Sequence, residues 1–288
     1  MRYAIIANPV AGKLTIDQKL SALANAAKIL KARIYGLDTA TPEEFGRCAL
    51  ELATRFDVLV IAGGDGTLSD VINCIDTAQR PVGFIPLGTG NAIRHALKYK
   101  GHLADIAARI RDGEIHEFDL IHCDRRRRAF TVSVGIEGTI IRLWDHYRLR
   151  GGTGFKTYFR AVLNGYLEAY KRTSARITID TSTFEINDLL SLMVVKQPYY
   201  GFGMRVVPKA RFDDRKLHIL CINAGLLKSA LGGVSAFVVG NRVGQYRTGR
   251  QLTLELARPL VMQHDGNEGW EAAMFNFAVL PRALKIKL

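Results

Sequence analysis

Two glycine-rich segments contain the side chains with the clearest capacity for chemistry. Residues 61–67 (IAGGDGT) end an apolar run typical of a buried strand, and they place one carboxylate, Asp65, and one hydroxyl, Thr67, among three glycines. Glycine lets the backbone turn tightly and approach a ligand, and a helix that begins here offers unpaired N–H groups to an anion. A carboxylate beside bound phosphate is repelled unless a cation lies between them, so Asp65 indicates Mg²⁺ with a nucleoside triphosphate.

The second segment, 86–91 (PLGTGN), lies about one supersecondary unit further along the chain. Two common phosphate-binding motifs are absent. A Walker A loop, GxxxxGK[ST], would need Ser or Thr after Lys13, where the chain has Leu14. A dinucleotide fingerprint, GxGxxG, would need its third glycine at the position of Ser69. Either segment alone is equally typical of a tight turn. Because both follow strand-like runs, together they predict a phosphate-binding site.

The order and spacing of three segments resemble the catalytic-domain family of the diacylglycerol kinases, namely 8–12 (NPVAG), 63–67 (GGDGT) and 86–91 (PLGTGN). The resemblance continues into the second half of the chain, in 199–205 (YYGFGMR), 208–214 (PKARFDD) and 264–266 (HDG). That family includes bacterial lipid kinases and the sphingosine and ceramide kinases. The NAD kinases share the GGDGT segment, but this chain lacks their TGSTAY motif.

The resemblance implies an ATP-dependent, Mg²⁺-requiring kinase that phosphorylates a hydroxyl of a diacylglycerol-like or related lipid. Asp65 would contact the phosphates of the nucleotide through Mg²⁺. The nucleotide-binding residues that the resemblance implies are Asn8, Pro9, Val10, Ala11, Gly12, Thr39, Gly63, Gly64, Asp65, Gly66, Thr67, Leu68, Ser69 and Thr89. Two alternatives stay open, a kinase of a soluble small molecule such as NAD and a catalytically silent nucleotide or lipid sensor.

Asp265 and Glu268 are the acid/base candidates, because a carboxylate within hydrogen-bond reach should accept the proton of the lipid hydroxyl. The family's motif reads Asp-Gly-Glu, whereas this chain has Asp265, Gly266, Asn267 and Glu268 in succession. Either Asp265 is sufficient, or a one-residue shift of the loop lets Glu268 replace the missing carboxylate.

The resemblance also implies a structural Mg²⁺ site, formed by the Asp214 side chain with the carbonyls of Arg211 and Lys216. Arg215 occupies the position of a family glycine, where it could strain the turn or bring a cation close to the site. A plain surface turn fits the segment equally well. Ala92 departs from the family's usual aspartate after GTGN, so polar contacts with the substrate are expected to differ.

The elements that position these residues change character along the chain. Strand-like and helix-like runs alternate at first, at 3–7, 16–31, 33–37, 42 onward, 57–62, 67–75, 81–85 and 91–97. This alternation predicts a parallel sheet covered by helices, with the glycine loops at the carboxyl ends of its strands. Short strand-like runs follow, interrupted by one helix at 154–171; the runs are 118–123, 129–134, 175–180, 189–195, 217–221, 251–256 and 260–263.

The sequence therefore predicts an α/β N-terminal domain with a parallel sheet at 1–118, followed by a mainly antiparallel β-sandwich domain at 119–281. We expect the final residues, 282–288, to pack back on the first domain. The nucleotide would bind the first domain, and the second would receive the lipid acceptor.

Composition indicates the partners. The chain has 288 residues and a net charge of +13, without an N-terminal signal pattern or an apolar run of about 20 residues. We expect a cytoplasmic protein, peripheral to the inner face of an anionic membrane, where each basic residue near the surface contributes about 1 kcal/mol. The basic and aromatic residues of 142–172 suit such an interface, but a helix packed against the sandwich would show the same aromatic stripe, so both interpretations stay open. No nucleic-acid-binding pattern accompanies the charge, the four cysteines lack metal-site spacing, and a homodimer is left open.

Overall fold

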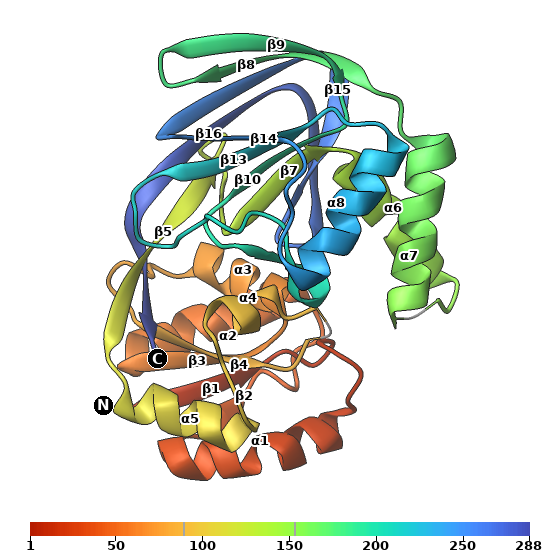
Figure 1. Cartoon of the computed structure of the whole chain (residues 1–288). Helices are drawn as coiled ribbons and strands as arrows, with labels where there is room; N and C mark the ends of the chain where they lie inside the picture. The colour runs from red at the N-terminus through yellow and green to blue at the C-terminus, as the bar shows by residue number, and fades with distance from the viewer. Residues whose placement is uncertain (89, 153) are drawn as a thin grey trace. The chain divides into compact units, whose positions relative to one another are not determined.

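The computed structural model describes residues 1–88, 90–152 and 154–288, and the chain divides into two compact units (Figure 1). Unit 1 contains residues 1–120, 201–203 and 281–288, and unit 2 contains residues 121–200 and 204–280. The predicted bounds did not anticipate the short return of the chain to unit 1 at 201–203.

Unit 1 is the predicted parallel sheet with helices on both faces. Its strand order is β16–β4–β3–β1–β2, and the pairs β1–β2, β1–β3, β3–β4 and β16–β4 are all parallel. Figure 1 shows α1 and α5 on one face of this sheet and α2 and α3 on the other. The elements are β1 (Tyr3–Ala7), α1 (Ile16–Leu30), β2 (Ile34–Tyr35), α2 (Pro42–Arg55), β3 (Val58–Gly63), α3 (Asp65–Cys74), β4 (Val82–Pro86), α4 (Ala92–Ala96) and α5 (Leu103–Asp112).

Local sequence explains most of these elements. Every residue of β1, β3 and β4 is buried, as expected for strands covered on both faces. Thr41 caps α2 by accepting a hydrogen bond from Glu44 N, with Pro42 at the first helical position. Helix α5 was not predicted, since the residue at its N-cap, His102, is not a usual capping residue.

Unit 2 is mainly antiparallel. Its strands follow the order β14–β13–β10–β7–β15–β16, and β8 pairs with both β15 and β9. Strands β5 and β16 each continue from one unit into the other. The strands are β5 (Ile115–Cys123), β6 (Arg127–Ala129), β7 (Thr131–Gly135), β8 (Thr173–Ile179), β9 (Ser182–Leu189), β10 (Ser191–Val195), β11 (Tyr199–Tyr200), β12 (Met204–Arg205), β13 (Leu217–Ile222), β14 (Gln245–Gly249), β15 (Gln251–His264) and β16 (Asn267–Lys287).

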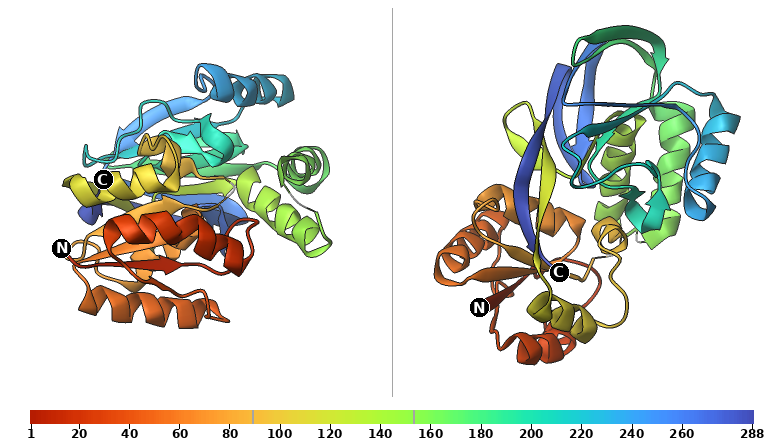
Figure 2. Two further views of the ribbon diagram at one scale, coloured as in Figure 1. Left: turned by 90° about the horizontal axis from the view of Figure 1, so that it is seen from below. Right: turned by 60° about the vertical axis from the view of Figure 1, so that its left-hand side comes forward.

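The core of unit 2 lies between these strands and includes Val132, Val194, Leu254, Met262 and Phe275. Within the described residues, the strands are accompanied by α6 (Ile136–Leu149), α7 (Gly154–Asn164, continued by a π-helical turn) and α8 (Leu226–Val238), and the right-hand view of Figure 2 shows α7 and α8 side by side. The sequence predicted only the helix beginning at 154. Helix α8 was missed because it is apolar around its circumference and its N-cap, Gly225, offers no side-chain cap.

Candidate active site

Three glycine-rich loops of unit 1 meet at the carboxyl ends of β1, β3 and β4. We call them the first loop (8–12), the second loop (63–67) and the third loop (86–91). The carbonyl of Gly63 accepts hydrogen bonds from Leu87 N at 2.8 Å and Gly88 N at 3.2 Å, which join the second and third loops. The Asn8 amide donates to Thr67 Oγ1 at 2.9 Å and joins the first loop to the second. Ligands of open α/β sheets bind at this edge, so the fold gathers the predicted phosphate-binding segments where a nucleotide can reach them.

Two glycines are required by the close approach of these loops. Gly12 has a φ of 69°, and a Cβ there would lie 2.2 Å from the carbonyl oxygen of Leu87. A Cβ at Gly88 would lie 2.5 Å from the Cα of Gly64. A side chain at either position would push the loops apart, because these neighbours are backbone atoms that cannot rotate away.

Asp65 has a role that the sequence did not predict. Its Oδ2 accepts a hydrogen bond from Ala92 N at 2.7 Å and its Oδ1 accepts one from Ile93 N at 3.0 Å, so the carboxylate holds the first turn of α4. Burial raises the pKa of Asp65, and the two backbone hydrogen bonds oppose that shift. The contact with nucleotide Mg²⁺ stays a prediction. It is compatible with this geometry, because such an ion takes one or two protein carboxylates and fills its other positions with phosphate oxygens and water.

Other predicted nucleotide-binding residues differ in accessibility. Val10 is 84% exposed, whereas Leu68 and Ser69 are fully buried and could offer only backbone groups to a ligand. The Thr39 hydroxyl donates to the carbonyl of Gly36 at 2.7 Å. Thr89 lies outside the described residues.

Lys19 is a candidate that the sequence analysis missed. Its side chain is 1% exposed, and its ammonium donates a hydrogen bond to the carbonyl of Pro9 in the first glycine loop. Burial lowers the pKa of Lys19. A sequence signal existed, since this lysine falls on the buried stripe of the helix, which consists of Lys19, Leu23, Ala26 and Leu30. A buried cation beneath a phosphate-binding loop would stabilise an anion bound there.

In unit 2, Asp265 is fixed by several donors. It and Gly266 form the two-residue turn between β15 and β16, with φ of 47° and 84°. Its Oδ1 accepts hydrogen bonds from Phe130 N at 3.1 Å, Thr131 N at 2.8 Å and Thr131 Oγ1 at 3.0 Å. The carboxylate therefore joins this turn to the start of β7 and is held in one orientation.

The one-residue loop shift, one of the two alternatives for the base, does not occur in the turn itself, and the register shift of this hairpin comes after Glu268. His264 pairs directly with Asn267, and Gln263 pairs with Glu268, so the turn has no extra residue. Because neighbouring residues of a strand point to opposite faces, Glu268 and Asn267 face different sides of the hairpin. Glu268 instead forms an ion pair with Arg142 at 2.6 Å. A role for Glu268 as a base stays a prediction, without the support of a shifted loop.

Glu137, in the first turn of α6, is a second residue that the sequence analysis missed. Its Oε1 accepts a hydrogen bond from Ser191 Oγ at 2.5 Å, while its buried Oε2 has no hydrogen-bond partner. Burial raises the pKa of Glu137 to about 7. Burial raises the pKa of Tyr200, and the charges of Glu137 and Asp265 raise it further, so both carboxylates act on the same hydroxyl of unit 2. The sequence signal was a lone carboxylate in the apolar run 132–141.

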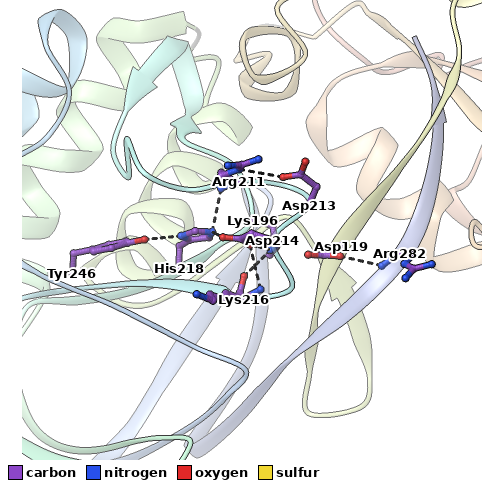
Figure 3. Close-up of polar contacts among 9 residues, drawn as sticks. All are labelled: Asp119, Lys196, Arg211, Asp213, Asp214, Lys216, His218, Tyr246 and Arg282. Atoms are coloured by element: carbon purple, nitrogen blue, oxygen red, sulfur yellow. Dashed lines mark hydrogen bonds and ion pairs between the residues drawn. The ribbon is translucent and has the colours of Figure 1, made fainter.

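The predicted structural metal site holds a lysine side chain. Lys196 Nζ donates to Asp214 Oδ1 at 2.8 Å and to the carbonyl of Lys216 at 2.6 Å (Figure 3). Burial raises the pKa of Asp214, but the hydrogen bond and charge of Lys196 outweigh it and lower the pKa overall. Within the described residues, no group of three or more His, Cys, Asp or Glu side chains could hold a metal ion.

Comparisons with known proteins agree with this architecture. Residues 2–123 match the model of the diacylglycerol kinase catalytic domain, and residues 130–288 match that of the YegS C-terminal NAD kinase beta sandwich-like domain. The chain is 29% identical over 221 residues to a diacylglycerol kinase of Staphylococcus epidermidis, covering 74% of this chain and 67% of the relative. A diacylglycerol kinase of Staphylococcus saprophyticus is 29% identical over 223 residues, covering 74% and 70%.

Solved structures share the fold. A diacylglycerol kinase structure from Bacillus anthracis aligns with a TM-score of 0.72 and 16% identity, covering 99% of this chain and 96% of the other. An NAD kinase from Archaeoglobus fulgidus in complex with ATP aligns with a TM-score of 0.54 and 10% identity, covering 99% and 93%. An α/β domain with three glycine loops is thus followed by a β-sandwich-like domain, and the chain belongs to the diacylglycerol kinase family. Among the described residues, none of the helices combines the length and apolarity needed to cross a bilayer.

Proposed function

We propose that the protein is an ATP-dependent lipid kinase that transfers the γ-phosphoryl group to a hydroxyl of a diacylglycerol-like or related lipid. The observation that carries this proposal is the convergence of the three family loops in unit 1, where Asn8, Gly63 and Thr67 link segments far apart in sequence. Catalysis of phosphoryl transfer mainly requires positioning of the reactants and neutralisation of charge, and these loops can contribute to both.

In this proposal, unit 1 supplies the phosphate-binding groups and unit 2 supplies the groups that act on the lipid acceptor. In unit 1 the three loops bind the phosphates, with Lys19 supplying positive charge beneath the first loop. When bound with the nucleotide, Mg²⁺ would neutralise phosphate charge, and Asp65 is the carboxylate available to contact it. In unit 2, Asp265 accepts the proton of the lipid hydroxyl as its oxygen bonds to the γ-phosphorus and ADP leaves. Glu137 accepts a hydrogen bond from the acceptor headgroup through its unpartnered Oε2.

The decisive experiment incubates the pure protein with labelled ATP and Mg²⁺, in the presence of either lipid extracts or NAD, and identifies the labelled product. We expect label in the organic phase. Label in NADP would replace the proposal with the soluble-substrate alternative. Nucleotide binding without any labelled product would support the silent sensor.

Glu137→Gln is expected to raise the KM for the lipid roughly 10- to 100-fold, the effect of losing a hydrogen bond to a charged group. For the wild-type enzyme, activity at low lipid concentration should increase as pH rises through about 7, the pKa of Glu137, because the ionised carboxylate accepts the headgroup hydroxyl more strongly than the protonated acid does. The variant should lose this pH dependence. The measurement is kcat and KM between pH 5.5 and 8.5.

Stability separates this role from a structural one. The pKa of Glu137 in the folded protein lies above the ordinary value of 4.5, so the stability of the fold falls as pH rises between these two values and the buried carboxylate ionises. Glu137→Gln should therefore leave Tm at pH 8 unchanged or higher. Glu185→Gln, which alters an exposed carboxylate of the same unit, is the matched control and should change neither KM nor its pH dependence. A wild-type KM and pH profile in Glu137→Gln would remove Glu137 from the acceptor site.

We further propose that an anionic membrane surface is the partner of unit 2. Helices α7 and α8 expose large apolar side chains and meet through Phe155 and Phe237, whose ring centroids are 6.5 Å apart. Exposed basic residues flank them, including Arg150, Lys156 and Arg160. Apolar side chains with a basic border suit the interface of an anionic bilayer. The exposed large apolar residues of the two helices, among those whose side chains are described, are Phe155, Phe159, Leu163, Leu227, Leu231, Val234, Phe237 and Val238.

Vesicle binding tests this surface. Co-sedimentation should require anionic lipid and should weaken with salt, since the Debye length falls from about 10 Å at 0.1 M to about 3 Å at 1 M. Replacing Arg148, Arg150 and Lys156 by Glu should reduce binding further. A control with the same charge change in unit 1, Lys28, Arg33 and Lys100 to Glu, should bind almost normally. Equal binding to neutral and anionic vesicles, unaffected by the first set of substitutions, would contradict the proposal.

A further inference from the structure

The turn at 211–216 encloses a buried ammonium group. Lys196 follows β10, and its side chain is 0% exposed. Its Nζ lies 2.8 Å from Asp214 Oδ1 and 2.6 Å from the carbonyl oxygen of Lys216. These two oxygens are two of the three groups that the family resemblance assigns to a structural metal ion. Figure 3 shows Lys196 and Lys216 converging on Asp214.

The remaining groups around Asp214 do not complete a metal site. Its Oδ2 lies 3.0 Å from His218 Nε2, and Arg211 N lies 3.1 Å from the same ring nitrogen. The other ring nitrogen of His218 lies 2.8 Å from the hydroxyl of Tyr246. Asp213, the second carboxylate of the turn, is exposed and pairs with Arg211 at 3.3 Å. Both carboxylates and the imidazole therefore have partners within the protein.

A metal ion and this ammonium cannot share the site. Mg²⁺ demands near-octahedral oxygen ligands at about 2.0–2.1 Å, and here the carboxylate and a carbonyl already accept hydrogen bonds from a cation. A buried lysine without a partner carries a large desolvation cost. Hydrogen bonds to these oxygens offset that cost for Lys196, and the ammonium in turn neutralises the charge of Asp214. Arg215 stands beside them in the left-handed conformation, with a φ of 57°, and it adds a positive charge to the turn.

We infer that the Lys196 ammonium replaces the structural metal ion, as a permanent internal cation of the Asp214 turn. The folded turn then requires no divalent ion, and Mg²⁺ serves this protein only together with its nucleotide. A single buried side chain, 18 residues from Asp214 in sequence, supplies the charge that the family motif would draw from solution.

This ion pair has a place in the architecture of the candidate site. Lys196 and Asp214 bracket the excursion of the chain that enters unit 1 at Gly201–Gly203. There Phe202 N donates a hydrogen bond to the carbonyl of Gly90, at 3.1 Å, in the third glycine loop. The ion pair between Lys196 and Asp214 thus closes the stretch of chain that contains Gly201–Gly203.

The inference is tested without nucleotide or lipid, so its outcome is independent of the proposed function. Wild-type protein is treated with EDTA and dialysed, and its Tm is compared with and without millimolar Mg²⁺ or Mn²⁺. We expect no change in Tm and no tightly bound Mn²⁺ by electron paramagnetic resonance. One equivalent of tightly bound Mn²⁺ that is lost in Asp214→Asn, together with a lower Tm in EDTA, would overturn the inference.

Variants test the lysine itself. Lys196→Met leaves Asp214 without its cation, and breaking a buried pair in this way should lower Tm by about 10 °C. Lys171→Met, which removes an exposed ammonium of the same unit, is the control and should change Tm little. Lys196→Met combined with Asp214→Leu removes both charges and should recover most of the lost stability. A Lys196→Met variant as stable as the control would show that the ammonium is dispensable and would contradict the inference.

Discussion

Asp265→Asn is expected to lower turnover by about 10²–10⁴-fold, the usual contribution of a general base. The asparagine can still accept the hydrogen bond from Thr131 N through its side-chain carbonyl, which preserves the turn between β15 and β16. It cannot accept the proton of the lipid hydroxyl, because an amide is far less basic than a carboxylate. The measurement is kcat with labelled ATP and the lipid identified in the product assay, with Tm recorded for each variant.

Two further variants serve as comparisons for Asp265→Asn. Thr131→Val removes one donor to Asp265 and keeps the carboxylate, so we expect a loss of activity much smaller than that of Asp265→Asn. Glu268→Gln should have a modest effect, since this residue is partly exposed and paired with Arg142. If Asp265→Asn and Glu268→Gln both retain wild-type turnover with an intact fold, the base does not come from this hairpin.

Features that depend on the backbone could be predicted from the sequence. The close approach of the loops could be predicted from Gly12 and Gly88, because only a residue without a side chain fits where the loops touch. The buried strands β1 and β3 were visible as short apolar runs. Their order along the chain was sufficient to predict a parallel sheet with the glycine loops at one edge.

Features that depend on the surroundings of a side chain could not be predicted. Nothing near Asp65 in sequence indicates that its partners are Ala92 and Ile93, because this contact arises only when α4 folds against the second loop. Similarly, the pKa of Glu137 is set by burial, which a single sequence does not record.

The predicted metal site at Asp214 also depends on a side chain that is distant in sequence. The motif around Asp214 is local, so it predicted oxygen ligands for a cation at this turn. The cation itself comes from Lys196, on another strand, and a local motif contains no information about it. A resemblance therefore transfers the electrostatic requirement of a site more safely than the identity of the group that satisfies it.

Asp65→Asn is expected to lower phosphoryl transfer by about 10²–10³-fold, because metal-mediated charge neutralisation of a transferring phosphoryl group is worth several kcal/mol. The amide group would also face the N–H groups of Ala92 and Ile93 with one acceptor instead of two, at a cost of about 1–3 kcal/mol in stability. Both effects act on the same loops, so activity alone does not separate them.

The Mg²⁺ dependence of activity separates them. If Asp65 contacts the ion of the nucleotide, Asp65→Asn should raise the Mg²⁺ concentration needed for half-maximal activity, and higher Mg²⁺ should restore part of the rate. If Asp65 only holds α4, the rate falls while the Mg²⁺ requirement stays unchanged. Asp17→Asn, an exposed carboxylate in the first turn of α1, is the control and should behave as the wild type. Near-normal turnover of Asp65→Asn with an unchanged Mg²⁺ requirement would remove Asp65 from both roles, since a fold that keeps its activity without this carboxylate does not need it to place the nucleotide loop.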